Sequence, residues 1–565
     1  MEKAKTQVLT AVALAGWTAA FAGGERRLSL EDYRDRMKGG WVGQIIGVTW
    51  GAPTEFKFSD RIIPEDAVPK WAPAMINQAF DQDDLYVEMT FLRSMEEYGL
   101  DVPIRQAGID LANTEYRLWC ANNAGRTNLR KGIAPPDSSH PRFNACPNDI
   151  DYQIEADYAG LIAPGMPGAV IALGEKFGRL MNYGDGVYGG QFMGGMYAEA
   201  FFEKELSKVI DAGLACIPAD SQYAEMVRDM VRWHRENPDD WQKTWNLCFQ
   251  KYRKDPAYQK ASNGGIDVKI NGAMVLLGLL YGQGDMEKTV TISMRGGYDS
   301  DCNPSSAAGV LGAMAGFSKL PARYTRELKL EPKFSYTAYN VPALLDVCER
   351  LARQVVARQG GRVEKGADGK EVFVIPVQPA KPDALALSWA PGPVAGSLFT
   401  PEEMAKIKFA IKVYPAGQFE DADPTKRVQK VLDVCFPGWT TSENGPDMNP
   451  GYREQEGQTF NVLVTHPAKK GEPVILSKTV KIPEGDPRLT VKVANAQNGD
   501  FRLAVKVDGA MAFETDVGGG HDFKTYAVGL SPYRGKTAAI EIVHQPTGWS
   551  NEAAYWAQIE VRGNN

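Results

Sequence analysis

The chain has 565 residues, of which 44% are hydrophobic and 24% charged, and its formal net charge is -7. This length exceeds what one hydrophobic core usually organises, so we expect two or more domains. A mildly acidic chain without a clustered basic face is not expected to bind nucleic acid.

Residues 1–22 have the pattern of a secretory signal peptide. Lys3 and Lys5 precede the apolar run "VLTAVALAGWTAAFA", which ends in the A-x-A cleavage pattern of Ala20 to Ala22. The run is short for a bilayer span. We therefore predict cleavage after Ala22, a secreted or periplasmic mature protein, and no stable membrane span after cleavage. A membrane anchor and a buried N-terminal helix are the alternatives.

Residues 27–360 are expected to be mostly helical. Ser29 and Asp32 have the spacing of a capping box. In "DDLYVEMTFLRSMEEYG" the apolar residues follow one helical stripe that Gly99 ends, and Asn340 is placed to cap a helix that Gly360 stops. This pattern predicts an all-α first domain.

The pattern changes near residues 360–370. Short segments with alternating apolar and polar residues follow, and Asn498-Gly499 is predicted to be a hairpin turn between two of them. We predict that residues 361–565 form an all-β, jelly-roll-like sandwich, with carbohydrate binding as its candidate role. Trp439, Trp549 and Trp556 are candidates for stacking on sugars, with a place in the hydrophobic core as the alternative for each.

The seven cysteines form no C-x-x-C pair, so their spacing predicts no zinc site. Free buried thiols are the expected state in a chain of this length. Cys120 and Cys146 are the first candidates for a disulfide in an oxidising compartment.

Three acidic groups stand out in the helical part. Glu55 follows a Gly-Ala-Pro turn, Asp83 and Asp84 enter one helix, and Asp299 and Asp301 enter another. Helix capping explains one acid per helix, and Asn303 and Pro304 already suit the start of the last helix. Two acids at each helix start repel each other, which a hard cation bound by oxygen ligands relieves. The small-residue run "SSAAGVLGAMAG" predicts that this helix is central and buried.

The order of these motifs resembles the ADP-ribosylglycohydrolase family, which includes relatives of crystallin J1. The resemblance rests on "GGWVGQIIGVTWGAPTEF", "QDD" and "GYDSDCNPSSAAGVLGAMAG", and spans roughly residues 30–325. It implies an all-α fold with two magnesium ions in a central cleft and cleavage of a glycosidic bond of ADP-ribose.

The resemblance also assigns residues. It implies Glu55, Asp83 and Asp301 as catalytic residues. The implied metal ligands are Gln82, Asp83, Asp84, Asp299, Asp301 and Cys302. Gln82 and Cys302 replace family hydroxyl residues, and a thiol is a poor ligand for Mg²⁺. The expected cofactor is therefore one or two Mg²⁺ ions, with Ca²⁺ or Mn²⁺ as alternatives.

Further polar residues are candidates for substrate contacts, with a solvated acidic surface as the alternative for several of them. They are Asn148, Asp149, Asp151, Asp157, Asp185, Tyr188, Asp267 and Asn271.

The expected function is a secreted, metal-dependent hydrolase of an N- or O-glycosidic bond to a ribose-like or other sugar. Its partner would be a sugar, an ADP-ribose-like molecule or a glycan. Two alternatives stay open: a non-catalytic sugar- or nucleotide-binding protein, and a metal-independent glycosidase that uses two carboxylates.

Overall fold

The computed structural model describes residues 24–456 and 459–564, so the predicted signal peptide lies outside the described residues. The chain divides into two compact units, Met1–Lys408 and Phe409–Asn565. Among the described residues, none of the helices combines the length and apolar character needed to span a membrane.

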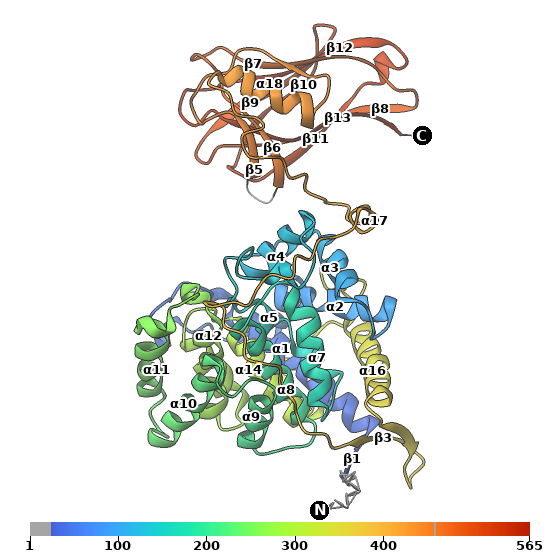
Figure 1. Ribbon diagram of the computed structural model, residues 1–565. Helices are drawn as coiled ribbons and strands as arrows, with labels where there is room; N and C mark the ends of the chain where they lie inside the picture. Colours follow the sequence, from blue (N-terminus) through green and yellow to red (C-terminus); the bar gives the residue numbers. More distant parts are fainter. Residues whose placement is uncertain (1–23, 457–458, 565) are drawn as a thin grey trace, which may run out of the picture. The chain divides into compact units, whose positions relative to one another are not determined.

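The first unit is built from helices, as predicted, and carries one small sheet, β1-β3-β2 (Figure 1). Its α-helices are α1 (Leu30–Gly51), α2 (Asp83–Tyr98), α3 (Ile104–Ala112), α4 (Ala121–Arg130), α5 (Asp151–Ile154), α6 (Asp157–Leu161), α7 (Pro167–Phe177), α8 (Asp185–Ala200), α9 (Leu206–Ala215), α10 (Gln222–Glu236), α11 (Trp241–Cys248), α12 (Val268–Gly282), α13 (Met286–Arg295), α14 (Cys302–Ala315), α15 (Ala322–Thr325), α16 (Val341–Arg358) and α17 (Pro401–Met404). The strands are β1 (Glu25–Ser29), β2 (Arg362–Lys365) and β3 (Glu371–Pro376).

The backbones of α1 and α14 are in direct contact along a row of glycines spaced four residues apart on α1. A Cβ atom added to Gly43 would lie 2.2 Å from the carbonyl oxygen of Ala308, and one added to Gly47 would lie 2.2 Å from that of Pro304. At the end of the row, a Cβ on Gly51 would lie 2.1 Å from the carbonyl oxygen of Ser300. These positions leave no space for a side chain, so glycine sets how α1 and α14 pack.

The predicted helix ends are largely confirmed. The hydroxyl of Ser29 accepts a hydrogen bond from the Asp32 amide at 3.0 Å, and the side chain of Asn340 accepts one from Ala343 at 3.0 Å. Gly99 follows α2 with a φ of 81°, a conformation that glycine adopts without strain.

The predicted start of α14, with Asn303 as the cap and Pro304 as the first helical residue, was two residues too late. The helix begins at Cys302 with Asp301 in the N-cap position, so Asn303 is not the cap. The Asn303 side chain instead donates to Asn271 Oδ1 at 2.9 Å. Pro304 is compatible with the earlier start because the first amides of a helix have no intrahelical acceptor.

The first unit extends beyond the predicted boundary at 360/361. Strands β2 and β3 pair in a sheet with β1, which precedes α1. The following segment packs on the helices: Ser388 donates to Asn148 Oδ1 at 2.5 Å, and the Ala134 amide donates to the Ser397 carbonyl at 2.9 Å. The boundary is therefore corrected to Lys408, since these contacts join residues 361–408 to the helical unit.

The second unit is a sandwich of two five-stranded antiparallel sheets, with strand orders β10-β9-β12-β7-β4 and β11-β8-β13-β6-β5. Apolar side chains of both sheets form its core. Its elements are α18 (Pro424–Cys435), β4 (Thr440–Thr441), β5 (Gly451–Glu456), β6 (Thr459–Thr465), β7 (Val474–Lys481), β8 (Asp486–Asn495), β9 (Asp500–Val507), β10 (Ala510–Gly518), β11 (Lys524–Gly529), β12 (Thr537–Gln545) and β13 (Ala554–Asn564). Trp439 and Trp556 are buried in this unit, whereas Trp549 is 37% exposed.

The predicted hairpin at Asn498-Gly499 is not present. Asn498 does have a positive φ of 62°, but β8 and β9 on either side of it belong to different sheets. Both strands place alternate side chains in the shared core, so their sequence pattern is the same as that of a hairpin. The Asp508-Gly509 turn makes a hairpin, because Val507 pairs with Ala510.

We expect Gly47→Ala to destabilise the helical unit by roughly 1–3 kcal/mol or more, because the new methyl group meets backbone atoms that cannot rotate away. Differential scanning calorimetry of the full chain measures this as a lower melting temperature. Gly168→Ala in α7 is the control, because a Cβ there meets nothing within 4 Å. Equal melting temperatures for the two variants would contradict the packing of α1 on α14.

Candidate functional site

Three chain segments meet where α1 ends. The turn after Gly51 carries Glu55, the first turn of α2 carries Asp83 and Asp84, and the segment before α14 carries Asp299 and Asp301. Side chains join them: Thr54 and Ser300 share a hydrogen bond of 2.7 Å, and the Cys302 thiol donates to Asp84 Oδ1 at 2.9 Å. These five acids therefore lie at one place.

Buried acids with unpartnered oxygens form the centre of this site. Asp84, Asp299 and Asp301 are each at most 3% exposed. A carboxylate oxygen of Asp299, one of Asp301 and the Cys302 sulfur lie within 4.8 Å of one another. Asp84 Oδ2 and Asp299 Oδ1 have no hydrogen-bond partner in the described part of the chain. Such oxygens, buried without a donor, are unusual in folded proteins.

The electrostatics of the site favour a cation. Burial, followed by the charge of Asp301, raises the pKa of Asp83 to about 7. Burial and the charges of Asp83 and Asp301 raise the pKa of Asp84 well above its ordinary value, and burial and Asp301 do the same for Asp299. The neighbouring charges that act most on these carboxyl groups are acidic, so a bound cation would stabilise their ionised forms.

Glu55 lies at the edge of the acidic group and is an exposed residue. Partial desolvation of its carboxyl group, followed by the charges of Asp301 and Asp83, nevertheless raises its pKa to about 7. A carboxyl group with this pKa is present in both protonation states near neutral pH. It is therefore suited to giving and taking protons.

The two residues that depart from the family pattern behave differently. Burial and the surrounding aspartates raise the pKa of the Cys302 thiol well above its ordinary value, so the sulfur remains a protonated donor to Asp84. Gln82 is the N-cap residue of α2, and its side chain does not cap the helix. Cys302 thus contributes no oxygen to the site and occupies one oxygen of Asp84.

Some predicted substrate residues lie beside this site. The Asp151 charge is among those that raise the pKa of Asp83, and Asp151 Oδ2 accepts from the Asn122 amide at 2.5 Å. Asn271 Oδ1 accepts from the Asp299 amide at 3.3 Å, so Asn271 positions the segment before α14.

Other predicted substrate residues are held by contacts of their own. The Tyr188 hydroxyl accepts from the Ala386 amide at 2.7 Å, and Asn148 bonds Ser388, so both residues hold the segment that follows the small sheet. Asp267 caps α12 and pairs with the buried Lys269 at 3.1 Å. Asp185 accepts from the Tyr223 amide at 3.1 Å. All four residues have structural partners, although Asn148 Nδ2 is buried without one among the residues that the structure describes, and their contact with a substrate stays a prediction.

Two more acids lie behind the site. Asp157 Oδ2 accepts from the Tyr197 hydroxyl at 2.7 Å. Glu88, which sequence reasoning missed, accepts from Gln44 at 3.0 Å and from the Tyr158 amide at 2.8 Å. Burial raises the pKa of Asp157 to about 8, with the hydrogen bond from Tyr197 opposing the shift. These buried acids link α1, α2, α6 and α8.

An aromatic group beside Asp83 was also missed. Tyr86 lies one turn after Asp83 on α2, and its ring packs edge-on against Tyr336 at 5.3 Å and tilted against Tyr116 at 5.0 Å. Tyr336 is 65% exposed and has a φ of 61°, which is strained for a residue with a bulky side chain. No sequence pattern predicts that this exposed ring comes to lie near α2.

The comparisons with known proteins agree with this arrangement. Residues 29–362, more than half of the chain, match the model of the ADP-ribosylglycohydrolase family. The chain belongs to the ADP-ribosylglycohydrolase family. The match begins at the cap of α1 and ends at β2, so it includes every segment of the acidic site. A comparison with curated proteins finds no match.

Several solved structures are similar at low identity. An ADP-ribosylglycohydrolase-related protein complex matches at 15% identity and a TM-score of 0.40, over 57% of this chain and 99% of that one. TmCBM61 in complex with beta-1,4-galactotriose matches at 16% identity and a TM-score of 0.18, over 23% of this chain and 90% of that one. A CBM4 structure matches at 13% identity and a TM-score of 0.17, over 27% of this chain and 100% of that one. Likenesses at this level assign neither a ligand nor an activity to this chain.

The acidic residues fit the hard cation that the family resemblance implies. Hard divalent ions take carboxylate oxygens, and the unpartnered oxygens of Asp84 and Asp299 lie in a group of acids that repel one another. The protonated thiol of Cys302 does not fit such an ion. The residues present therefore support one oxygen-ligated ion better than two.

We expect replacement of Asp83 to change how stability depends on pH. The folded pKa of Asp83, about 7, exceeds the value of about 3.9 in an unfolded chain. Between these values the folded state binds more protons, so ionisation of Asp83 destabilises the metal-free protein as pH rises. The difference in melting temperature, Asp83→Asn minus the unmodified chain, measured in EDTA, should therefore increase from about pH 4 to pH 7.

Asp220→Asn is the control for this experiment, because Asp220 is exposed and far along the chain from the acidic segments. Its melting temperature should stay at a fixed offset from that of the unmodified chain. A constant offset for Asp83→Asn as well would show that Asp83 is not in the environment described.

Proposed function

We propose that this protein is a secreted, metal-dependent hydrolase of an N- or O-glycosidic bond to a ribose-like or other sugar. The observation that carries the proposal is the group of buried aspartates with unpartnered oxygens beside Glu55. Membership of a hydrolase family supports the reaction class, and the raised pKa values support the metal and the proton transfer.

Asp83, Asp84, Asp299 and Asp301 would hold the cation. A bound divalent ion supplies orientation of sugar hydroxyls and a lowered pKa for its bound water. Asp299 and Asp301 precede α14, whose position is fixed by α1, so their carboxylates are held on a rigid element. The thiol of Cys302 donates to Asp84 and thereby fixes one of its oxygens.

Glu55 would transfer the proton to or from the group that leaves. Its pKa of about 7 keeps a substantial protonated fraction at neutral pH, and its exposure allows a substrate to reach it. Asp301 and Asp83 favour the protonated form of Glu55 through their negative charges. Proton transfer by such a group contributes on the order of 100–10,000-fold to a rate.

The exposed ring of Tyr336 would supply contact for the rest of the substrate. Its packing against Tyr86 and Tyr116 holds the ring beside the helix that carries Asp83. An exposed aromatic face suits the apolar face of a sugar or a base.

We include in the proposal that the β-sandwich binds glycan through the exposed Trp549, whose ring packs edge-on against His466. Trp549→Ala should then weaken glycan retention and leave turnover of a small soluble substrate unchanged.

We expect Glu55→Gln and Asp301→Asn each to lower kcat by about 100-fold or more, because the first removes the proton donor and the second a metal ligand. ADP-ribosyl-arginine and p-nitrophenyl furanosides are the substrates to assay. Asp220→Asn is the matched control and should retain full activity. Full activity of both site variants on a substrate that the unmodified chain cleaves would overturn the assignment.

The same assay separates the alternatives. A metal-independent glycosidase would keep its rate in EDTA, whereas the proposed enzyme loses activity and recovers it with added Mg²⁺ or Mn²⁺. A binding protein would retain the ligand after Glu55→Ala and release no product from any substrate.

A further inference from the structure

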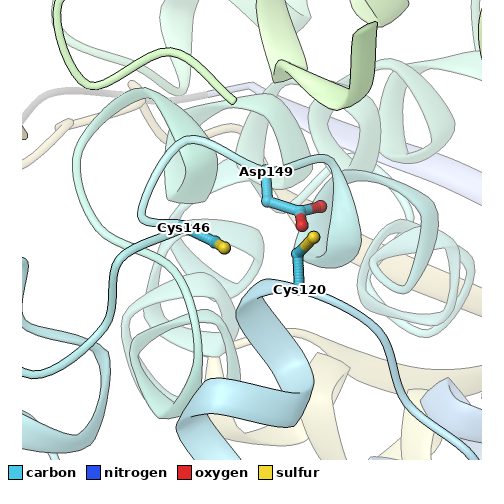
Figure 2. A group of neighbouring side chains, drawn as sticks. All are labelled: Cys120, Cys146 and Asp149. Atoms are coloured by element: carbon cyan, nitrogen blue, oxygen red, sulfur yellow. The ribbon is translucent and has the colours of Figure 1, made fainter. Parts of the chain in front are cut away.

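Two thiols and a buried carboxylate converge outside the acidic site. Figure 2 shows Cys120, Cys146 and Asp149 with their sulfur and carboxylate atoms turned toward a common space. One atom from each of the three side chains lies within 4.8 Å of the other two. Asp149 was predicted to contact substrate, but the structure places it with these thiols.

The backbone holds all three residues in place. Cys120 immediately precedes α4, and Asp149 Oδ2 accepts from the next amide, that of Ala121, at 3.1 Å. Asn144 ties the Cys146 loop to the same helix: its Oδ1 accepts from the Cys146 amide at 2.9 Å, and its Nδ2 donates to the Ala121 carbonyl at 3.0 Å. Because Asn144 is fully buried, this link is shielded from water.

The carboxylate of Asp149 is also oriented by its own loop. Asp149 Oδ1 accepts from the Asp151 amide at 3.1 Å, so each carboxylate oxygen receives one backbone hydrogen bond. Asp149 is fully buried, whereas both cysteines are half-buried. The group therefore has a buried, fixed carboxylate and two cysteines that are partly exposed to solvent.

The electrostatics suit a cation that binds thiolates. Burial, followed by the charge of Asp151, raises the pKa of Asp149 well above its ordinary value. A hydrogen bond from Cys120 lowers the pKa of the Cys146 thiol, whereas the same hydrogen bond and burial raise the pKa of Cys120. Metal binding would stabilise the ionised forms of all three groups, since it replaces their mutual repulsion with attraction.

We propose that Cys120, Cys146 and Asp149 form a second metal site, specific for a thiophilic divalent cation of the Zn²⁺ class. Zn²⁺ is bound by thiolates at about 2.3 Å and by carboxylate oxygens at about 2.0–2.2 Å, whereas Mg²⁺ avoids sulfur. Three protein ligands leave a fourth tetrahedral position for water or a ligand, in keeping with the partial exposure of both cysteines. The cysteine spacing gave no sign of this site, because its ligands come from separate segments.

Cobalt(II) is the probe that tests the proposal, because cobalt bound to thiolate has a charge-transfer absorption in the near ultraviolet. The full chain is reduced, freed of reductant under anaerobic conditions, and titrated with CoCl₂ at neutral pH. We expect one equivalent to produce the band and added ZnCl₂ to remove it. Cys120→Ser and Cys146→Ser should each lose it, and Asp149→Asn should weaken cobalt binding at least tenfold.

Two control variants should keep the band. Cys435→Ser removes a half-buried thiol of the second unit, and Asp301→Asn removes a ligand of the acidic site. Melting temperatures show whether each variant is folded, and the serine and asparagine substitutions are close in size to the residues they replace.

A reduced, folded chain with all thiols titratable and no cobalt band would overturn the proposal. So would a band that survives in both Cys120→Ser and Cys146→Ser. A Cys120–Cys146 disulfide, found by mass spectrometry in a chain that binds no cobalt after reduction, would show that the pair is a redox site instead. Loss of the band in Asp301→Asn would place the cobalt in the acidic site.

Discussion

The contact between α1 and α14 is the constraint on which the rest of the helical unit depends. Glycine at every fourth position of α1, from Gly39 to Gly51, allows the two backbones to touch. At the end of this row the segment Ser300–Asp301 lies against Gly51, and the turn to Glu55 continues from there. A helix pair brought together by backbone contact has little freedom to slide. Glu55, which follows α1, and Asp299 and Asp301, which precede α14, are consequently fixed relative to each other at the Gly51 end of the contact.

The cost of this arrangement is electrostatic. Asp84, Asp299 and Asp301 are buried together, and burial raises the pKa of each carboxyl group. For Asp84 and Asp299 the charges of neighbouring acids raise the pKa further. The folded chain can accommodate these buried carboxyl groups if they stay protonated or if they bind a cation. A bound cation allows them to be ionised at neutral pH. Glu55 at the exposed edge responds to the same field. The group that would hold the ion therefore also tunes the group that would transfer the proton.

Local sequence patterns predicted the helix caps and the acidic residues of the site. Ser29 and Asn340 cap their helices because capping depends on residues three positions apart. The acids in the first turn of α2 and before α14 were recognised from their pairing in sequence. Long-range contacts were not predictable. The sequence around Asn498-Gly499 has the same alternation whether the chain turns within a sheet or crosses to the other, and it crosses. Residues 361–408 carry no sequence pattern that identifies the helices they pack against. The cysteine spacing likewise does not show that Asp149 lies beside Cys120 and Cys146.

The measurement that tests the central claim most directly is anomalous scattering from crystals of the full chain grown with Mn²⁺ near neutral pH. The acidic group predicts a manganese peak coordinated by carboxylate oxygens of Asp83, Asp84, Asp299 and Asp301 at about 2.1 Å, close to the distance typical of Mg²⁺. It also predicts that Asp301→Asn crystals lose or weaken this peak. Crystals with saturating Mn²⁺ and no peak among these four residues would contradict the account.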